Sequence, residues 1–142
     1  MPSPASQSTW SAYCDGASRG NPGPASYGVL VCDPNGTVVR EAKARLGINT
    51  NQVAEYEGLI RALTELKAAG ARRAHVYTDS EFVVKQYTGQ YKIRDARMQA
   101  LMARVRAIAA GFESLQLTHI RRSSHPHNKR CDQLANEALD DK

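Results

Sequence analysis

The sequence has no hydrophobic run that approaches the ~20 apolar residues of a membrane-spanning helix. Its first eight residues are rich in proline and serine, and they lack the basic start and apolar centre of a signal peptide. We therefore expect a short disordered tail over residues 1–8 and a cytoplasmic protein with no membrane partner. Internal repeats and interior linkers are also absent, so residues 9–142 are expected to form one domain.

Cysteine is scarce, and the three residues Cys14, Cys32 and Cys131 form no pair with the spacing of a metal or redox motif. An odd number of cysteines in a cytoplasmic chain favours free thiols. If Cys14 and Cys32 lie on neighbouring strands, a disulfide bridge between them is the alternative.

Acidic residues are missing from a basic stretch between Thr118 and Cys131. The whole chain carries 19 lysines and arginines against 14 acids, and the formal net charge of +5 suits a polyanionic partner. The stretch predicts a loop that faces phosphate groups, and a solvated basic loop is the alternative. Its basic residues and histidines are His119, Arg121, Arg122, His125, His127, Lys129 and Arg130.

Hydrophobic periodicity predicts an α/β fold with the element order βββαβααβα. The turn signal at residues 33–36 makes the first three strands an antiparallel meander, and the long helix that follows suits a crossover to a parallel strand. We therefore expect a mixed five-stranded sheet, three antiparallel strands and then parallel strands, flanked by helices. The predicted strands are 10–15, 25–32, 37–46, 74–78 and 115–120, and the predicted helices run from the caps at 47–51 to 69, from the cap at 80 to 88, from 95 to 110 and from 127 to 139.

Four acids stand at the ends of these elements. Asp15 ends the first strand, Asp79 ends the fourth, Glu55 lies in the first turns of the long helix, and Asp132 opens the last helix. If the first and fourth strands are adjacent and parallel, their carboxyl ends place Asp15 and Asp79 side by side. Clustered carboxylates repel one another unless a cation compensates, and hard oxygen ligands favour magnesium or manganese. Taken singly, each acid is more often a cap than a metal ligand.

Residues 16–24, directly after Asp15, contain three glycines, an asparagine and two prolines. Glycine and asparagine tolerate positive φ, and proline fixes φ, so this stretch predicts a shaped loop between two strands. A polar glycine loop beside an acid is where a metal or phosphate site is expected. A hairpin with no further role is the alternative.

Four stretches of the chain resemble, in order and in spacing, the motifs of type 1 ribonuclease H, in a compact form without the basic protrusion of many bacterial members. They are Asp15-Gly16 with Gly20-Asn21-Pro22-Gly23-Pro24, then Thr50 to Tyr56, then Tyr77 to Ser80, and finally His125 to Ala135. The resemblance implies a ribonuclease H-like fold, with residues 9–142 as the catalytic domain. The element order predicted from periodicity agrees with this fold.

The resemblance also implies an activity, namely hydrolysis of the RNA strand of RNA–DNA hybrids to leave 5′-phosphate and 3′-hydroxyl ends. It implies two Mg²⁺ ions, with Mn²⁺ as a substitute, held by Asp15, Glu55, Asp79 and Asp132. Asp15 is expected to bridge the ions, Glu55 to lie near the substrate 2′-hydroxyl, and Asp132 to hold the ion beside the attacking water. Glu57 does not match the family spacing, so we expect it to face solvent or to form an ion pair. The expected state is a monomer that binds a hybrid duplex.

Distinguishing RNA from DNA requires groups that reach the 2′-hydroxyl. The resemblance assigns this contact to the glycine-asparagine loop and the start of the long helix, where loop and helix capping is the second role. The residues concerned are Gly16, Asn21, Asn51 and Gln52. Thr50 is a candidate contact to a phosphate of the DNA strand. The basic residues Arg121, Arg122, Lys129 and Arg130 are expected to attract the backbone in a salt-dependent manner.

The chain departs from the family pattern in two places. The only tryptophan is Trp10, and the segment after the second helix is short, so Tyr91 and Lys92 provide at most a lesser platform and hybrid binding is expected to be weaker. Arg122 stands where many bacterial members carry a loop histidine. Arginine does not titrate near neutral pH, but it can stabilise phosphate charge or help a product leave. A structural role is the expectation for His125, and a part in proton transfer is the alternative.

Two other functions compete with the hybrid-cleaving enzyme. A catalytically weak RNA–DNA hybrid-binding module is one, and the complete set of four acids argues against it. A related nuclease or integrase-like enzyme acting on DNA is the other, and the Asn51-Gln52 pair with the glycine-asparagine loop argues for hybrid recognition instead.

Overall fold

The computed structural model describes residues 8–141, so the predicted tail lies outside the described residues except for Ser8. One five-stranded sheet has the order β3-β2-β1-β4-β5, and the element order confirms the predicted fold. The strands are β1 (Thr9–Ser18), β2 (Gly23–Cys32), β3 (Val38–Asn49), β4 (Arg73–Thr78) and β5 (Ser114–His119). The helices are α2 (Asn51–Ala68), α3 (Glu81–Tyr87), α4 (Ala96–Ala109) and α5 (Pro126–Asp140).

Strand β1 is the centre of the sheet, antiparallel to β2 and parallel to β4. Its last partner on β4 is Thr78, which lies opposite Cys14. Asp15 and Asp79 are therefore the next residues along two neighbouring parallel strands, as predicted. The prediction that Asp15 ends the strand is wrong, because pairing with β2 continues to Ser18 and extends β1 past the end of β4.

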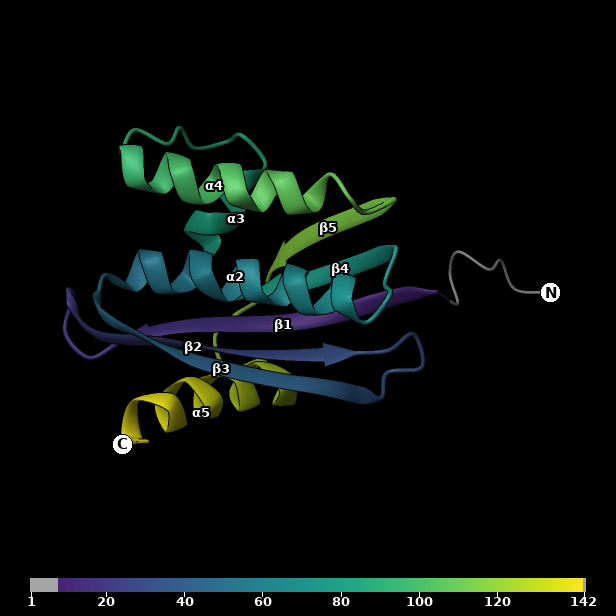
Figure 1. Ribbon diagram of the computed structural model, residues 1–142, viewed down its shortest axis with the longest axis horizontal. Coiled ribbons are helices and arrows are strands. Elements are labelled where there is room, and N and C mark those ends of the chain that lie inside the picture. Colours follow the sequence, from purple (N-terminus) through teal and green to yellow (C-terminus); the bar gives the residue numbers. More distant parts are fainter. Residues whose placement is uncertain (1–7, 142) are drawn as a thin grey trace.

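The helices cover the sheet from both sides. Figure 1 shows α2 across one face, with α3 and α4 beyond it, and α5 on the opposite face. Helix α2 packs on β1 and β2, and α5 packs on β1, β2 and β3. Within the described part of the chain, no helix is long and apolar enough to cross a membrane. The carboxyl ends of β1 and β4 stay open between these layers, which is where ligands bind in open α/β sheets.

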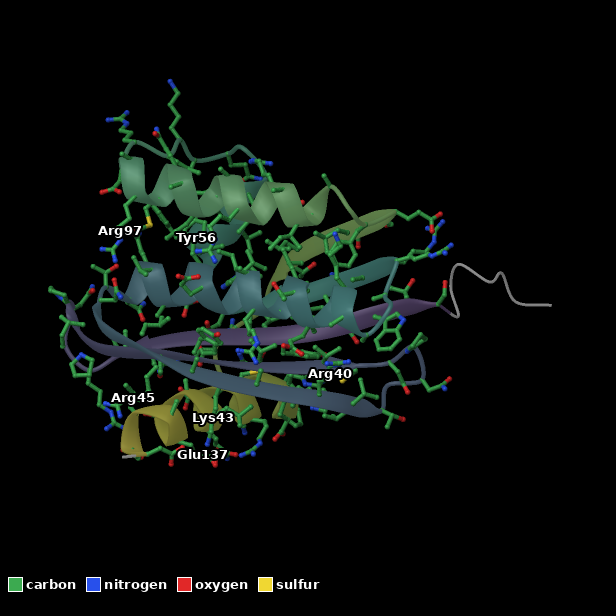
Figure 2. The ribbon with its side chains drawn as sticks, viewed as in Figure 1. Arg40, Lys43, Arg45, Tyr56, Arg97 and Glu137 are labelled. Atoms are coloured by element: carbon green, nitrogen blue, oxygen red, sulfur yellow. The ribbon has the colours of Figure 1, made fainter. Side chains whose placement is uncertain are left out.

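Helix α2 forms where the sequence supplies both a cap and an apolar stripe. Thr50 is its N-cap, and the Thr50 hydroxyl accepts a hydrogen bond from the backbone N–H of Val53 at 3.2 Å. Apolar side chains recur at helical spacing and are buried, each worth about 1.5–3 kcal/mol relative to exposure. Tyr56 lies on the side away from the sheet, where its hydroxyl donates to Gln86 of α3 (Figure 2). The stripe fixes the rotation of α2 and so directs Glu55 towards β1.

Helix α5 approaches the other face of the sheet closely because β2 has a glycine at the contact. A Cβ atom on Gly28 would lie 2.1 Å from the carbonyl oxygen of Cys131. The hydroxyl of Ser26 donates to the carbonyl of Ala135 at 2.6 Å, which pins the helix to the same strand. This tight seat fixes the position of Asp132, one residue after Cys131.

All three cysteines are buried and free. Cys14 belongs to the core under α2, whereas Cys32 belongs to the smaller core under α5, so the two thiols lie on opposite faces of the sheet. The expectation of free thiols is confirmed, and the alternative disulfide is not formed.

Candidate active site

Three carboxylates meet at the carboxyl ends of β1 and β4. Asp15, Glu55 and Asp79 each offer an oxygen, and these oxygens all lie within 4.8 Å of one another. The first two side chains are buried, with 5% and 8% of their surface exposed. Asp15 comes from β1, Glu55 from the second turn of α2, and Asp79 follows β4, so the cluster depends on the packing of three elements.

Glu55 is held in place by the backbone of the strand that it faces. The backbone N–H of Gly16 donates to Glu55 Oε1 at 2.7 Å. A Cβ atom on Gly16 would lie 2.4 Å from the backbone of Ala54, so only glycine allows β1 to come this close to α2. Gly16 thus positions a carboxylate, and its contact to the substrate stays a prediction.

Asp79 is positioned by the start of α3. The hydroxyl of Ser80 caps this helix by accepting a hydrogen bond from the N–H of Val83 at 3.3 Å. The N–H of Ser80 in turn donates to the hydroxyl of Thr78 at 3.1 Å. These two bonds shape the turn that carries Asp79 to the edge of the sheet beside Asp15.

Ionisation of the three carboxylates is unfavourable within the cluster. Burial raises the pKa of Asp15, and the charges of Glu55, Asp79 and Asp132 raise it further. Burial and the charge of Asp79 raise the pKa of Glu55, although the Gly16 N–H and Arg122 act in the opposite direction. Burial also raises the pKa of Asp79. Crowded, buried oxygen donors of this kind are the ligand set that suits a hard divalent cation.

The fourth predicted acid lies at the rim of the cluster. Asp132 is not one of the three carboxylates whose oxygens lie within 4.8 Å of one another, and 38% of its side chain is exposed. Its Oδ1 lies 3.8 Å from Nη2 of Arg122, the residue predicted to act in the basic loop. The structure thus brings Arg122 and Asp132 together beside the buried acids.

A pocket of about 460 Å³ opens over the carboxylates. Asn21 and Asn51 line it together, and the N–H of Asn51 donates to Asn21 Oδ1 at 3.0 Å, which ties the glycine-asparagine loop to the start of α2. Thr50 caps α2, and Gln52 is exposed in the first turn but does not line this pocket. The complete lining is Asp15, Gly16, Ala17, Ser18, Asn21, Asn51, Glu55, Asp79, Ser80 and Arg122.

The remaining basic residues are divided between two places. Arg121 and Lys129 are exposed near the start of α5. Arg130 instead donates to Glu41 of β3 at 2.9 and 3.0 Å and to Glu137 at 3.2 Å. Figure 2 shows Glu137 beside α5 at the lower edge of the molecule, and Arg130 is not among the residues that line the pocket, so the structure does not bring Arg130 to the pocket. We call these contacts between α5 and β3 the seam.

Two expectations about neighbouring residues are confirmed. Glu57 forms an ion pair with Arg104 at 3.2 Å, and Glu55 is the glutamate that belongs to the carboxylate cluster. His125 has a structural role, since its Nδ1 accepts the N–H of His127 at the start of α5 and its ring stacks on Tyr13 at 5.0 Å.

An exposed aromatic pair is formed by Phe82 of α3 and Tyr91 of the short segment that follows this helix. Tyr91 packs against Phe82 with ring centroids 5.6 Å apart, and the ammonium of Lys85 lies 5.1 Å from the Tyr91 ring centroid. Lys92 lines a second, smaller pocket of about 240 Å³ beside this pair. Sequence reasoning identified Tyr91 and Lys92 but not Phe82, because the apolar pattern of α3 does not reveal that this ring is 40% exposed.

The chain resembles known proteins in sequence along most of its length. Residues 13–138 match the family described as reverse transcriptase-like. The chain is 42% identical over 130 residues to ribonuclease HI of Halobacterium salinarum, and the alignment covers 92% of this chain and 64% of that protein. The chain therefore spans less than two thirds of the length of this relative.

Solved structures extend the likeness to three dimensions. RNase H1 from the halophilic archaeon Halobacterium salinarum superposes with a TM-score of 0.89 at 40% identity, covering 94% of this chain and 99% of that one. LC11-RNase H1, crystallised in complex with an RNA/DNA hybrid, superposes with a TM-score of 0.84 at 39% identity, covering 92% and 96% of the two chains. The chain belongs to the type 1 ribonuclease H family.

Proposed function

We propose that this protein is a divalent-metal-dependent endoribonuclease that hydrolyses the RNA strand of RNA–DNA hybrids and leaves 5′-phosphate and 3′-hydroxyl ends. One observation carries the proposal: three carboxylates with oxygens within 4.8 Å of one another face an open pocket beside the glycine-asparagine loop. The likeness to a relative crystallised with an RNA/DNA hybrid supports the choice of substrate.

Two Mg²⁺ ions, for which Mn²⁺ can substitute, are the cofactors proposed for the carboxylate cluster. Bound there, such ions supply an activated water and stabilise the leaving oxygen of a phosphodiester. Asp15, the most central of the acids, would contribute to both ions, with Glu55 and Asp79 beside it. Asp132, at the rim, would complete the ion on the side of the attacking water.

The chain's own groups bind and orient the substrate in this proposal. The Gly16 N–H holds one oxygen of Glu55, which leaves the other oxygen for the reacting region near the 2′-hydroxyl. Asn21 and Asn51 line the pocket with amide groups that can donate to and accept from a 2′-hydroxyl. Gln52 and the capping residue Thr50 lie at the start of the same helix, where Gln52 would contribute to sensing the 2′-hydroxyl and Thr50 would contact a phosphate of the DNA strand.

Arg122 would stabilise phosphate charge at the pocket. It lines the pocket, and 77% of its side chain is exposed, so its guanidinium can reach a bound backbone. Arginine suits this task because its planar fork binds phosphate oxygens in pairs. Arg121 and Lys129 would add long-range attraction that weakens with salt, whereas Arg130 is already engaged with Glu41 and Glu137.

The test is incubation of the protein with labelled RNA–DNA, RNA–RNA and DNA–DNA duplexes in Mg²⁺ or Mn²⁺. We expect cuts in the RNA strand of the hybrid alone, with ends that a 3′-hydroxyl-dependent polymerase can extend. Hybrid binding without cleavage in either metal would instead identify a catalytically weak binding module. Cleavage of DNA–DNA would overturn the proposed substrate.

A further inference from the structure

The loop between β5 and α5 carries Arg122 over the acidic pocket. We propose that Asn128, a buried residue of α5, is a positioning residue that holds this loop and thereby places Arg122 at the substrate. The inference rests on the function proposed above, in which Arg122 acts on a substrate phosphate.

Asn128 has one amide atom in use and one without a partner. The side chain is 2% exposed, and its Oδ1 accepts a hydrogen bond from the backbone N–H of Ser123 at 2.6 Å. Its Nδ2 is the one buried side-chain nitrogen or oxygen without a hydrogen bond among residues 8–141. A leucine has the same branching at Cγ and would bury no orphaned donor here. What the amide adds beyond packing is therefore the acceptor for Ser123.

Ser123 adopts a backbone conformation that needs such support. Its φ is +59°, and it is the one residue other than glycine with positive φ in the described chain. The N–H of Ser124 donates to the carbonyl of Arg121 at 3.1 Å, so Arg122 and Ser123 are the two central residues of a turn. A left-handed residue at the third position of a turn sets the direction of the whole turn, and it persists only where neighbours hold it. The hydrogen bond that the Ser123 N–H donates to Asn128 Oδ1 is what holds it here.

Arg122 depends on this turn because little else fixes its position. With 77% of its side chain exposed, packing does not restrain it. Its nearest acid is Asp132, at 3.8 Å, and an exposed ion pair of this length is weak in water. The backbone of the turn therefore decides whether the guanidinium lies over the pocket. Further along the loop, the stack of His125 on Tyr13 secures the start of α5.

Two substitutions break the same bond from opposite sides. Asn128→Leu removes the acceptor from the helix, and Ser123→Pro removes the donor from an exposed loop position while excluding positive φ. We expect either change to lower kcat/KM for hybrid cleavage about 10- to 100-fold, as misplacement of a reacting group by an ångström does. Ser123→Gly keeps the N–H and favours positive φ, so it is expected to retain wild-type activity.

The decisive measurement is a double-mutant cycle with Arg122→Ala. If Asn128 acts through Arg122, Asn128→Leu will cause no further loss once Arg122 is alanine, and Ser123→Pro will behave in the same way. Gln133→Leu, the same kind of amide-to-leucine change at an exposed position of α5, is the matched control and should leave cleavage unchanged. Independent, additive losses in the Arg122→Ala background would overturn the proposal.

Hydrogen exchange separates this inference from the proposed activity. The Ser123 amide proton should exchange slowly in the wild type and in Gln133→Leu, and at least about tenfold faster in Asn128→Leu, because opening is then unopposed. Fast exchange in the wild type would refute the restraint even if the enzyme is active. A protected amide in a protein that fails to cut hybrids would refute the proposed function and leave the restraint standing. If Asn128→Leu does not fold, the Ser123→Pro and Ser123→Gly pair carries the same test from the loop.

Discussion

Two regions of this molecule gather carboxylates, and they treat the charge in opposite ways. At the carboxyl ends of β1 and β4, buried acids face one another, and burial raises the pKa of Asp15 and Glu55. In the seam between β3 and α5, Glu41 faces Arg130, and hydrogen bonds from that guanidinium lower the pKa of Glu41. In the seam, the charge of Glu41 is compensated by Arg130. The cluster instead favours bound protons or a cation, as the carboxylates of metal-binding and catalytic sites do.

The largest effect is expected from replacing Asp15 in the carboxylate cluster. Asp15→Asn is expected to reduce cleavage by about 1,000-fold, because losing a ligand of the catalytic ions forfeits several kcal/mol of transition-state stabilisation. The same change should raise the metal-free free energy of unfolding at pH 7 by about 2 kcal/mol, because Asp15 ionises freely only in the unfolded chain and asparagine removes this advantage of the unfolded state. Initial cleavage rates and urea unfolding in EDTA check both effects. Full activity in Asp15→Asn would sink the assignment of the site.

Two glutamates on α2, Glu55 and Glu57, allow metal ligation to be separated from nearby charge. Glu55→Gln is expected to reduce cleavage by about 100-fold or more, since its oxygens belong to the cluster. Glu57→Gln removes only the exposed pair with Arg104 and should leave the cleavage rate within about twofold of wild type. Steady-state rates for the two variants, measured side by side on one hybrid, give the contrast. Equal losses at both positions would mean that charge near α2, and not ligation, matters.

The two regions should also respond oppositely to pH. Above an ordinary carboxyl pKa of about 4, the unfolded chain releases protons that the folded cluster still holds. The cluster's stabilising contribution is therefore full below that pKa and is lost as pH rises through the raised values of Asp15 and Glu55. Glu41, with a lowered pKa, contributes above its ordinary pKa and loses this on acidification.

Thermal unfolding in EDTA measures this pH dependence. We expect the Tm to fall as pH rises from 6 to 8, and Mg²⁺ to restore it more strongly at pH 8, where the ligands lose protons more readily. The double variant Asp15→Asn with Glu55→Gln should flatten both trends. A Tm that varies with pH as steeply in the double variant as in the wild type would contradict the role of the cluster.

The smallest effect is expected in the seam. Arg130→Ala removes exposed pairs with Glu41 and Glu137 and should lower the free energy of unfolding by about 0.2–1 kcal/mol, less in high salt. Hybrid cleavage and its salt dependence should stay unchanged, because Arg130 does not reach the pocket. Lys129→Ala is the matched comparison and should weaken hybrid binding at low salt. A larger loss of hybrid affinity in Arg130→Ala than in Lys129→Ala would show that Arg130 belongs to the hybrid-binding surface.

Most of the fold could be predicted from the sequence because its signals are local. The apolar stripe of α2 and the caps Thr50 and Ser80 depend on residues within one or two turns of each other. The cluster could be predicted as well, once β1 and β4 were taken as parallel neighbours. The end of β1 could not be predicted, because pairing with β2 carries the strand past Asp15 to Ser18. Likewise, nothing in the basic stretch separates Arg130 from Lys129, since their partners lie on different elements.

By itself, the sequence determined the order of the elements, the four candidate acids and the family to which the chain belongs. Only the tertiary structure decided which acids meet and that Gly16 orients Glu55. It also decided that Arg130 pairs with Glu41 in the seam and that Asn128 accepts a hydrogen bond from the turn that carries Arg122. The physical reason is the range of the interactions. Propensity and periodicity act over a few neighbouring residues, whereas a hydrogen bond from β1 to α2, or an ion pair from α5 to β3, exists only after distant segments have packed.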